Sequence, residues 1–376
     1  MQITDITMFY AAQGGVSTYL TAKASWIAQH TQIDHVIVAP SHGGRSDAHL
    51  LRVPSLPIPG NATFRMPRSI TSTSRVLRRL QPDLIEVGDP YQCAWAALRL
   101  KRERDVPLII FHHSDLVQLV GSRFGQHAAM LATRYLVHLY REFDLVLTPS
   151  EVMAQRLRDI GIQRAQRQPL GVDTRVFSPT ARDVGLRRAL RLAPDTRLLV
   201  YAGRFSREKR LDLLIQAVAQ LGAPYHLLLI GGDEYGPPVP HVTCLPFQHD
   251  AIRLARLLAS CDLLVHGGDA ETFGLVVLEA MACGLPVLGV AAGGVAELVD
   301  ADTGLLVAPN RVDLLAEGIV SLFERDLAQL GMNARHKVQQ HYDWNIIVPQ
   351  MMARYASLLA VYERIGTNTR SDYAIE

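Results

Sequence analysis

The chain has 376 residues, of which 48% are hydrophobic and 20% charged, a composition typical of globular and not of disordered proteins. This length exceeds that of one ordinary hydrophobic core and predicts two domains. The formal net charge of +2 is too small to indicate nucleic acid as a partner.

Targeting and cysteine patterns favour a cytoplasmic protein. The first residues lack the basic start and long apolar core of a signal peptide, and no run of about 18 uncharged apolar residues occurs to span a bilayer. The four cysteines show no metal-ligand spacing, so we interpret them as small buried side chains and expect no metal site.

Short apolar segments alternate with helical patterns through the first half of the chain. The segments predicted as strands are residues 3–9, 35–39, 84–87, 108–112 and 145–148, with a helix at 16–29. Alternation of this kind is typical of βα units and a mainly parallel sheet, so the predicted fold class is α/β.

Two strand ends in this half could contact a ligand. Gly14 and Gly15 follow the first strand and open a helix, where backbone amides can approach a phosphate. They are not the three-glycine dinucleotide fingerprint, and a simple tight turn is the alternative. His113 follows a central strand and could donate to a hydroxyl or a phosphate. For His112 we expect a structural hydrogen bond to Asp115.

The basic excess of the chain belongs to its first half. Residues 1–180 carry 20 Lys and Arg against 14 Asp and Glu, and the remainder carries 18 against 22. Arginines mix with apolar residues around 65–79 and over 121–141. A basic amphipathic surface of this sort can lie on an anionic membrane, and a solvated helical face is the alternative.

The alternating pattern breaks between residues 168 and 194, where we place the interdomain linker, near residue 180. The second half predicts strands at 198–202, 226–230, 242–247, 263–266 and 286–290, and helices at 211–221, 273–283, 312–324, 327–341 and 346–365. Residues 366–376 are expected to form a polar tail.

Two cations follow the first strand of the second half. Arg204 lies just after Gly203 at the strand end, and Lys209 lies at the start of the next helix. Their charges would add to the helix N-terminus and suit a diphosphate, while a solvated surface run is the alternative. The Pro-rich loop 235–240 could form a wall for a flat base, with Phe247 near its exit.

A strand, a tight turn, a helix and a strand are predicted over residues 262–290, and this unit contains two carboxylates. Glu271 lies in the turn, and Glu279 lies eight residues later inside an apolar helix. An unpaired buried carboxylate is costly, so Glu279 is expected to face a cleft or a polar partner. The amides around Phe273 and Gly274 could bind an anion. In the alternative interpretation, Glu271 only stabilises the first helical turn and Glu279 is one exposed residue.

Taken together, the motifs resemble family 4 glycosyltransferases of the GT-B fold. They occur in the family's order: Gly14-Gly15-Val16, the strand end 111–115, Gly203-Arg204 with Glu208-Lys209, and ETFGLVVLEAMACGLPV at 271–287. The resemblance implies two Rossmann-like domains facing across a nucleotide-sugar cleft. It implies an acceptor-binding domain at 1–180, a donor-binding domain at 181–345, and a helix at 346–365 that crosses back onto the first domain.

The same resemblance implies a retaining, metal-independent enzyme without a cofactor. It implies that Arg204 and Lys209 neutralise the donor diphosphate, and that Gly15 and the backbone amides of Phe273, Gly274 and Leu275 also bind it. It implies that Glu271 and His113 bind hydroxyls of the transferred sugar. Glu279 would bind the ribose hydroxyls. No nucleophile is evident on the reacting face, which favours same-face attack by the acceptor.

In pattern the chain is most similar to bacterial glycolipid (diacylglycerol) glycosyltransferases and related mannosyltransferases. This similarity implies transfer of a hexosyl or hexuronosyl unit from a UDP- or GDP-sugar to a membrane lipid, with peripheral contact to the anionic inner face of the membrane. The alternatives are a glycan acceptor in surface polysaccharide assembly, a nucleotide-sugar 2-epimerase, and a non-catalytic sensor or scaffold.

Overall fold

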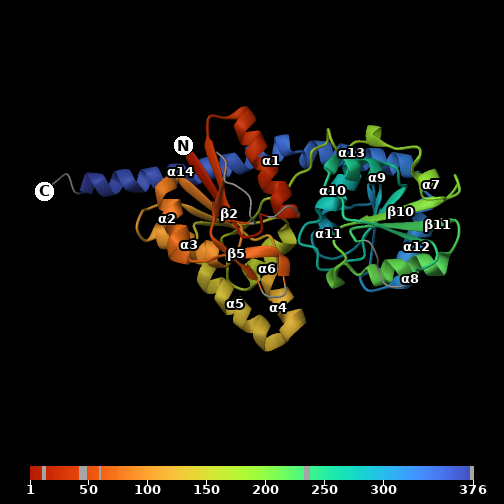
Figure 1. Cartoon of the computed structure of the whole chain (residues 1–376), viewed down its shortest axis with the longest axis horizontal. Helices are drawn as coiled ribbons and strands as arrows, with labels where there is room; N and C mark the ends of the chain where they lie inside the picture. The colour runs from red at the N-terminus through yellow and green to blue at the C-terminus, as the bar shows by residue number, and fades with distance from the viewer. Residues whose placement is uncertain (11–13, 42–48, 59–60, 233–237, 373–376) are drawn as a thin grey trace. The chain divides into compact units, whose positions relative to one another are not determined.

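The computed structural model describes residues 1–10, 14–41, 49–58, 61–232 and 238–372, and it contains two compact units (Figure 1). Unit 1 comprises Met1–Gln168 and Ile347–Glu376, and unit 2 comprises Pro169–Ile346. The division falls ahead of the linker expected near residue 180. The C-terminal helix enters unit 1 at Ile347.

Unit 1 contains a seven-stranded parallel sheet in the order β3-β2-β1-β6-β7-β8-β9. Its strands are β1 (Gln2–Ile6), β2 (Asp34–Pro40), β3 (Leu50–Val53), β6 (Leu84–Val87), β7 (Leu108–Phe111), β8 (Leu145–Thr148) and β9 (Ala165–Arg167). Its helices are α1 (Gly15–His30), α2 (Ile70–Leu80), α3 (Gln92–Lys101), α4 (Leu116–Phe124), α5 (Gln126–Tyr140) and α6 (Glu151–Asp159), joined by most of α14 (Trp344–Asp372).

Unit 2 contains a six-stranded parallel sheet in the order β12-β11-β10-β13-β14-β15. Its strands are β10 (Arg197–Ala202), β11 (Tyr225–Ile230), β12 (Val242–Leu245), β13 (Leu263–Val265), β14 (Val287–Val290) and β15 (Gly304–Val307). Its helices are α7 (Leu186–Ala189), α8 (Leu211–Leu221), α9 (Ala251–Ala259), α10 (Leu275–Ala282), α11 (Val295–Leu298), α12 (Val312–Phe323) and α13 (Leu327–His341), with 3₁₀ turns at Pro179–Ala181 and Arg207–Lys209.

Both sheets are doubly wound, which confirms the predicted α/β class. In each, the chain starts in a central strand, moves to one edge, and returns to build the other side, so the strand order reverses beside β1 in unit 1 and beside β10 in unit 2. Ligands of open parallel sheets bind outside the carboxyl ends of the strands at this reversal. We therefore expect a ligand site of unit 2 at the strand-order reversal beside β10.

The central strands are buried along their whole length and mostly apolar, as expected where helices cover both faces of a parallel sheet. All four residues of β6, β7 and β8 are buried, as are the three of β13. Helix starts are set by short polar caps: the Ser69 side chain accepts a hydrogen bond at the start of α2, and Ser150 does so for α6. These local signals explain why most predicted elements occur where the sequence pattern placed them.

One region of unit 1 was not predicted. Between β3 and α2 the chain forms an antiparallel pair, β4 (Ser55–Ile58) and β5 (Asn61–Pro67), with a register shift near its turn. The segment around Arg65, interpreted from the sequence as part of a basic amphipathic surface, thus lies in β5. Arg65 Nε donates to Ser55 Oγ across the pair at 2.8 Å. The Arg65 side chain therefore stabilises the β4–β5 pair.

Candidate functional site

Lys209 and Glu271 meet at the strand-order reversal of unit 2. Lys209 ends the 3₁₀ turn that follows β10, and Glu271 lies in the loop between β13 and α10. Because β10 and β13 are neighbouring parallel strands, the two loops leave the same edge of the sheet. The Lys209 ammonium donates to the Glu271 carboxylate, and only 19% and 15% of the two side chains are exposed.

Glycine makes this approach of the two loops possible. A Cβ atom on Gly268 would lie 2.8 Å from the Glu208 carbonyl oxygen and 3.2 Å from Lys209 Cα. Contacts that short do not occur with a real side chain, so only glycine lets the loop after β13 pass the 3₁₀ turn. The glycines after β13 are therefore part of what brings Lys209 and Glu271 together.

A second glycine pair holds the Glu271 turn from the other side. The Gly294 amide donates to the Glu271 carbonyl at 2.7 Å, and a Cβ atom on Gly294 would lie 2.5 Å from Phe273 Cα. Gly293 adopts a φ of 58°, in the left-handed region that favours glycine. Gly293 and Gly294, which lie between β14 and α11, thus hold the Glu271 turn in place.

The charge state of Glu271 is set by its neighbours. Burial alone would raise the pKa of its carboxyl, but Lys209 and His266 together hold that pKa well below its usual range. His266 is fully buried, and its Nε2 lies 3.6 Å from Glu271 Oε2. Glu271 is therefore ionised at neutral pH and can only accept hydrogen bonds. Sequence reasoning placed His266 at a strand end without assigning it a role.

Glu279 differs from Glu271 in having no partner. It lies in the middle of α10, its side chain is partly buried, and burial raises the pKa of its carboxyl to about 7. Within the described part of the chain its carboxylate makes no hydrogen bond or ion pair. A desolvated carboxylate of this kind is costly without a ligand, so the structure does not favour the interpretation of Glu279 as one exposed residue. Ribose binding stays a prediction.

The loop before α10 presents backbone amides. The helix predicted from residue 273 begins at Leu275, because Gly274 has a φ of 97° and lies outside the helix. The amides of Phe273, Gly274 and Leu275 precede any intrahelical acceptor, so they are free in principle to bind an anion. The Phe273 side chain itself is buried, so only its backbone could contribute.

Arg204 and Phe247 lie at the same sheet edge but do not contact the ion pair. The Arg204 side chain is exposed and makes no ion pair within the described ranges. Phe247 follows β12, is partly buried, and packs edge-on against His249 at 5.2 Å between ring centroids. Residues 235–237 of the loop expected beside the base lie outside the described residues.

The remaining predicted residues belong to unit 1. Gly14 is exposed with a φ of 112° and precedes α1, which begins at Gly15. The His113 ring stacks on Phe111 at 4.3 Å between ring centroids with planes 3° apart, and lies 5.5 Å from the Tyr19 ring. Burial, helped by nearby positive charge, lowers the pKa of His113 to about 3, so the imidazole is neutral at pH 7.

His112 has a different partner from the one expected. Its Nδ1 shares a hydrogen bond of 2.8 Å with the Tyr140 hydroxyl, and its side chain is buried. Asp115 instead caps α4 by accepting from the Gln118 amide, and its other oxygen pairs with Arg156 at 3.0 Å. The structural role expected for His112 holds, but the bond to Asp115 was wrong because Asp115 is needed as a helix cap.

Comparison with known proteins identifies the family. The profile described as "Glycosyltransferase Family 4" matches residues 13–176, and the one described as "Glycosyl transferases group 1" matches residues 185–338. A GDP-mannose-dependent alpha-mannosyltransferase of Mycobacterium tuberculosis is 30% identical over 82% of this chain and 79% of its own length. The chain belongs to the family 4 glycosyltransferases. It is an enzyme that transfers a sugar from a nucleotide sugar.

Two further similarities cover almost the whole of this glycosyltransferase. A GDP-mannose-dependent alpha-(1-6)-phosphatidylinositol dimannoside mannosyltransferase of M. tuberculosis is 28% identical over 97% of this chain and 98% of its own length. The solved structure of sucrose-phosphate synthase from Thermosynechococcus elongatus superposes with a TM-score of 0.79 at 22% identity, covering 96% of this chain and 99% of that one. The fold is therefore GT-B, as the resemblance implied.

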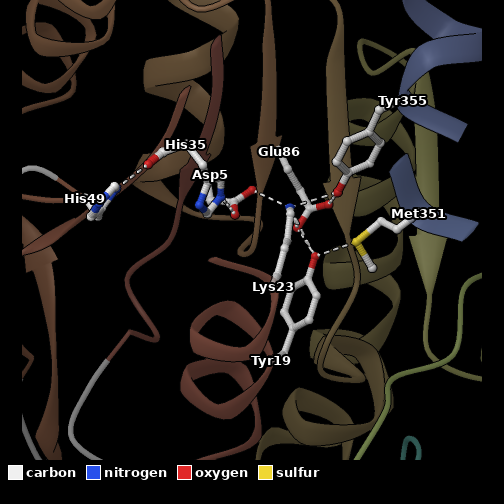
Figure 2. A network of polar contacts seen from close by, with 8 residues as sticks. All are labelled: Asp5, Tyr19, Lys23, His35, His49, Glu86, Met351 and Tyr355. Atoms are coloured by element: carbon white, nitrogen blue, oxygen red, sulfur yellow. Dashed lines mark hydrogen bonds and ion pairs between the residues drawn. The ribbon is translucent and has the colours of Figure 1, made fainter. Parts of the chain in front are cut away.

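Sequence reasoning missed a buried polar network in unit 1 of the glycosyltransferase (Figure 2). The fully buried Lys23 donates to Asp5 at 2.8 Å and to the Tyr355 hydroxyl at 2.9 Å, and it lies 3.3 Å from Glu86. The Tyr19 hydroxyl donates to Glu86 at 2.6 Å. Tyr355 belongs to α14, so this network attaches the C-terminal helix to the sheet.

Opposing effects set the protonation of the network. The pKa of Glu86 is raised by burial and by Asp5, in spite of Lys23. Burial also acts to raise the pKa of Asp5, but Lys23 and His35 lower it. His35 Nε2 lies 2.6 Å from Asp5. The signal that could have found this network is an acidic residue inside a short buried strand, as in QITDI and LIEV.

The described residues contain neither a metal-ligand cluster nor a membrane-spanning helix. Across these ranges, no group of three or more His, Cys, Asp and Glu side chains is placed to hold a metal ion. In the same ranges, no helix combines the length and the apolar character needed to cross a bilayer.

Proposed function

We propose that this family 4 glycosyltransferase transfers a hexosyl unit, with mannose from GDP-mannose as the first candidate, to a hydroxyl group of a membrane lipid with retention of the anomeric configuration. The mannosyltransferase names of the relatives support the donor, and the phosphatidylinositol-linked acceptor in one of those names supports a lipid. A UDP-hexose donor and a polysaccharide-linked acceptor are the other outcomes that the experiment below separates.

The observation that carries the proposal is the partly buried ion pair of Lys209 and Glu271, with Glu279 on the helix that follows. Breaking the anomeric bond leaves negative charge on the diphosphate while the sugar becomes oxocarbenium-like. Lys209 is a fixed cation suited to that charge. Glu271, ionised by its neighbours, is suited to accept hydrogen bonds from sugar hydroxyls, and Glu279 is suited to accept them from the ribose.

Charge stabilisation needs more than one donor. Arg204 supplies a second cation just after β10, the strand that Lys209 also follows. The backbone amides of Phe273, Gly274 and Leu275 supply neutral donors before α10. In this proposal these groups replace a divalent metal, so the leaving diphosphate departs without one. The acceptor hydroxyl attacks on the face that the diphosphate leaves, and its proton passes to the departing phosphate.

Unit 1 carries two further predicted site elements, His113 and the Gly14–Gly15 turn. A neutral imidazole can either donate or accept one hydrogen bond, which suits a sugar hydroxyl better than a phosphate. Its ring is fixed by stacking on Phe111, so it would act as a positioned partner and not as a titrating base near pH 7. Gly15 offers an amide at the start of α1, a position suited to a phosphate group.

The experiment is a donor panel. The purified chain is incubated with GDP-mannose, UDP-glucose, UDP-galactose and ADP-glucose. Each donor is tested without acceptor, with total membrane lipid and with surface polysaccharide, and every combination is run with and without EDTA. We expect GDP release and a new mannosylated lipid, identified by mass, with the α-anomer seen by NMR. Epimerised donor without nucleotide release, or binding without turnover on any acceptor, would overturn the proposal. Loss of activity in EDTA would overturn its metal-independent part.

A further inference from the structure

Helices α4 and α5 form a hairpin whose outer surface is apolar. None of the nine residues of α4 is fully buried: Leu116 and Val117 pack partly against the core of unit 1, while Leu119 and Phe124 face outward. Four large hydrophobic side chains of the hairpin are exposed: Leu119 (51%), Phe124 (68%), Met130 (48%) and Leu131 (62%). Helices in proteins gain stability mainly by burying an apolar face. We therefore expect the exposed apolar face of the hairpin to be buried against a partner outside the chain.

The hairpin is nevertheless well fixed to unit 1. The inner face of α5 contributes buried Leu136 and Leu139 to the core, and the Tyr135 hydroxyl donates to the Pro90 carbonyl at 2.5 Å. The two helices also pack closely, since a Cβ atom on Gly121 would lie 3.2 Å from Ala129 Cβ. Figure 1 shows α4 and α5, in yellow, extending beyond the sheet of unit 1. Exposure of this surface therefore does not come from a loosely attached segment.

The charges of the hairpin all have one sign. Residues 116–141 contain no Asp or Glu, and their cations are Arg123, Arg134 and Arg141, with His127 and His138 in addition. On α5 the exposed residues His127, Met130, Leu131, Arg134 and His138 recur at three- and four-residue spacing, so basic and apolar side chains share one helical face. An acid-free, basic and apolar face matches an anionic lipid surface in both respects.

We infer that the α4–α5 hairpin docks on a bilayer containing anionic phospholipid, with its apolar side chains at the acyl–headgroup boundary and its arginines at the lipid phosphates. The inference rests on the proposed lipid acceptor for its biological purpose. α4 begins three residues after His113, and its cap Asp115 is held by Arg156. A docked hairpin would thus keep the chain next to His113 at the membrane surface, where a lipid hydroxyl is available.

The test measures binding without turnover. Full-length protein is sedimented with vesicles of phosphatidylcholine alone or with 30% phosphatidylglycerol, where the percentage is roughly that of an anionic membrane. We expect binding to the anionic vesicles that falls with salt. Phe124→Ser/Leu131→Ser should weaken that binding at least about tenfold. Arg123→Gln/Arg134→Gln should weaken it by about tenfold and remove most of the salt dependence.

Matched controls come from unit 2. Ile252→Ser/Met332→Ser removes two side chains of similar exposure (55% and 59%), and Arg188→Gln/Arg253→Gln removes two exposed arginines; both should bind vesicles as the wild type does. Thermal midpoints and GDP binding should be the same for all variants. Equal vesicle binding by the hairpin variants and the wild type would overturn the inference.

A second readout keeps the hairpin intact. Phe124→Trp places a fluorophore on the exposed face. Its emission should be quenched by vesicles of brominated phosphatidylcholine that contain 30% phosphatidylglycerol, roughly the anionic fraction used above, with Ile252→Trp as the unquenched control. Absence of quenching at Phe124→Trp would overturn the inference. If vesicle binding and quenching occur while the donor panel yields no glycolipid, membrane docking stands and the proposed lipid acceptor fails.

Discussion

Lys209 and Glu271 form an ion pair although 62 residues separate them in the chain. The pairing of β10 with β13, and not sequence proximity, brings their loops together at the strand-order reversal. The positive charge of Lys209 and the negative charge of Glu271 balance each other within the pair. A diphosphate that binds Lys209 would release the Glu271 carboxylate, which could then accept hydrogen bonds from sugar hydroxyls. The ion pair thus holds both side chains in position for these two roles.

Replacing Lys209 by Gln should lower turnover by about 10²- to 10³-fold, the usual effect of removing one preorganised donor from a developing negative charge. The measurement is the initial rate of nucleotide release with GDP-mannose and lipid acceptor. Arg207→Gln is the matched control, because this exposed cation lies in the same 3₁₀ turn and makes no ion pair among the described residues. Near-normal turnover in Lys209→Gln would show that Lys209 does not stabilise the leaving diphosphate.

Glu279 gives a prediction about pH. Its pKa is raised from 4.5 to about 7 by burial, so between these values the folded protein binds a proton that the unfolded chain has lost. Its contribution to stability is full below pH 4.5 and is lost as the pH rises through 7. Glu279→Gln should therefore raise the free energy of unfolding at pH 8, by up to about 3 kcal/mol, and have little effect at pH 5.

Urea unfolding of the wild type and Glu279→Gln at pH 5, 6, 7 and 8 measures that difference. Glu279→Gln should bind nucleotide more weakly than the wild type, since an amide accepts hydrogen bonds from ribose hydroxyls less well than a carboxylate does. Glu142→Gln serves as a control, because this carboxylate is exposed to solvent. A stability difference that does not vary with pH would contradict the assignment of Glu279 as a strained carboxylate.

Gly294→Ala should damage the site by moving the Glu271 turn. The added Cβ would meet Phe273 Cα at 2.5 Å, and backbone cannot yield as a flexible side chain can. We expect weaker donor binding and a loss of about 1–3 kcal/mol in stability. Gly185→Ala is the control, because its Cβ would meet only the Asp183 side chain, at 3.1 Å. Donor affinity by calorimetry and thermal unfolding give the two readouts; unchanged donor affinity in Gly294→Ala would contradict the clamp.

The sequence was informative where local signals decide the structure. The helices at 211–221 and 327–341 and the strands at 84–87 and 145–148 have the predicted bounds, since each is an apolar or amphipathic segment with clear ends. Strand-end positions also predicted the neighbourhood of Lys209 and Glu271, because parallel strands share one carboxyl edge.

Other features depend on contacts between distant segments, and the sequence pattern could not supply them. The β4–β5 pair rests on cross-strand bonds, and the partner of His112 is Tyr140, 28 residues away. Lys23 lies in a helix in which a lysine is ordinarily solvated. It is fully buried here because Asp5, Glu86 and Tyr355, from three separate elements, surround it.

The buried network provides the last prediction. Lys23→Met leaves Asp5 and Glu86, which are register partners on β1 and β6, as two neighbouring buried carboxylates without the ammonium group that pairs with both. Removing one member of a buried charge cluster costs about 3–5 kcal/mol, because the remaining charges stay desolvated. Lys101→Met is the matched control: its pair with Asp144 is more exposed, at 24% and 19%, and its loss should cost under about 1 kcal/mol.

Urea unfolding measures both variants, and a second substitution separates charge from packing. In Lys23→Met/Glu86→Gln the excess negative charge is reduced by one, so the double variant should recover part of the stability lost in Lys23→Met. Because Tyr355 of α14 donates to Glu86, protection of α14 amides from hydrogen exchange should fall in Lys23→Met and partly return in the double variant. Equal losses in the Lys23 and Lys101 variants would show that the network does not secure the C-terminal helix.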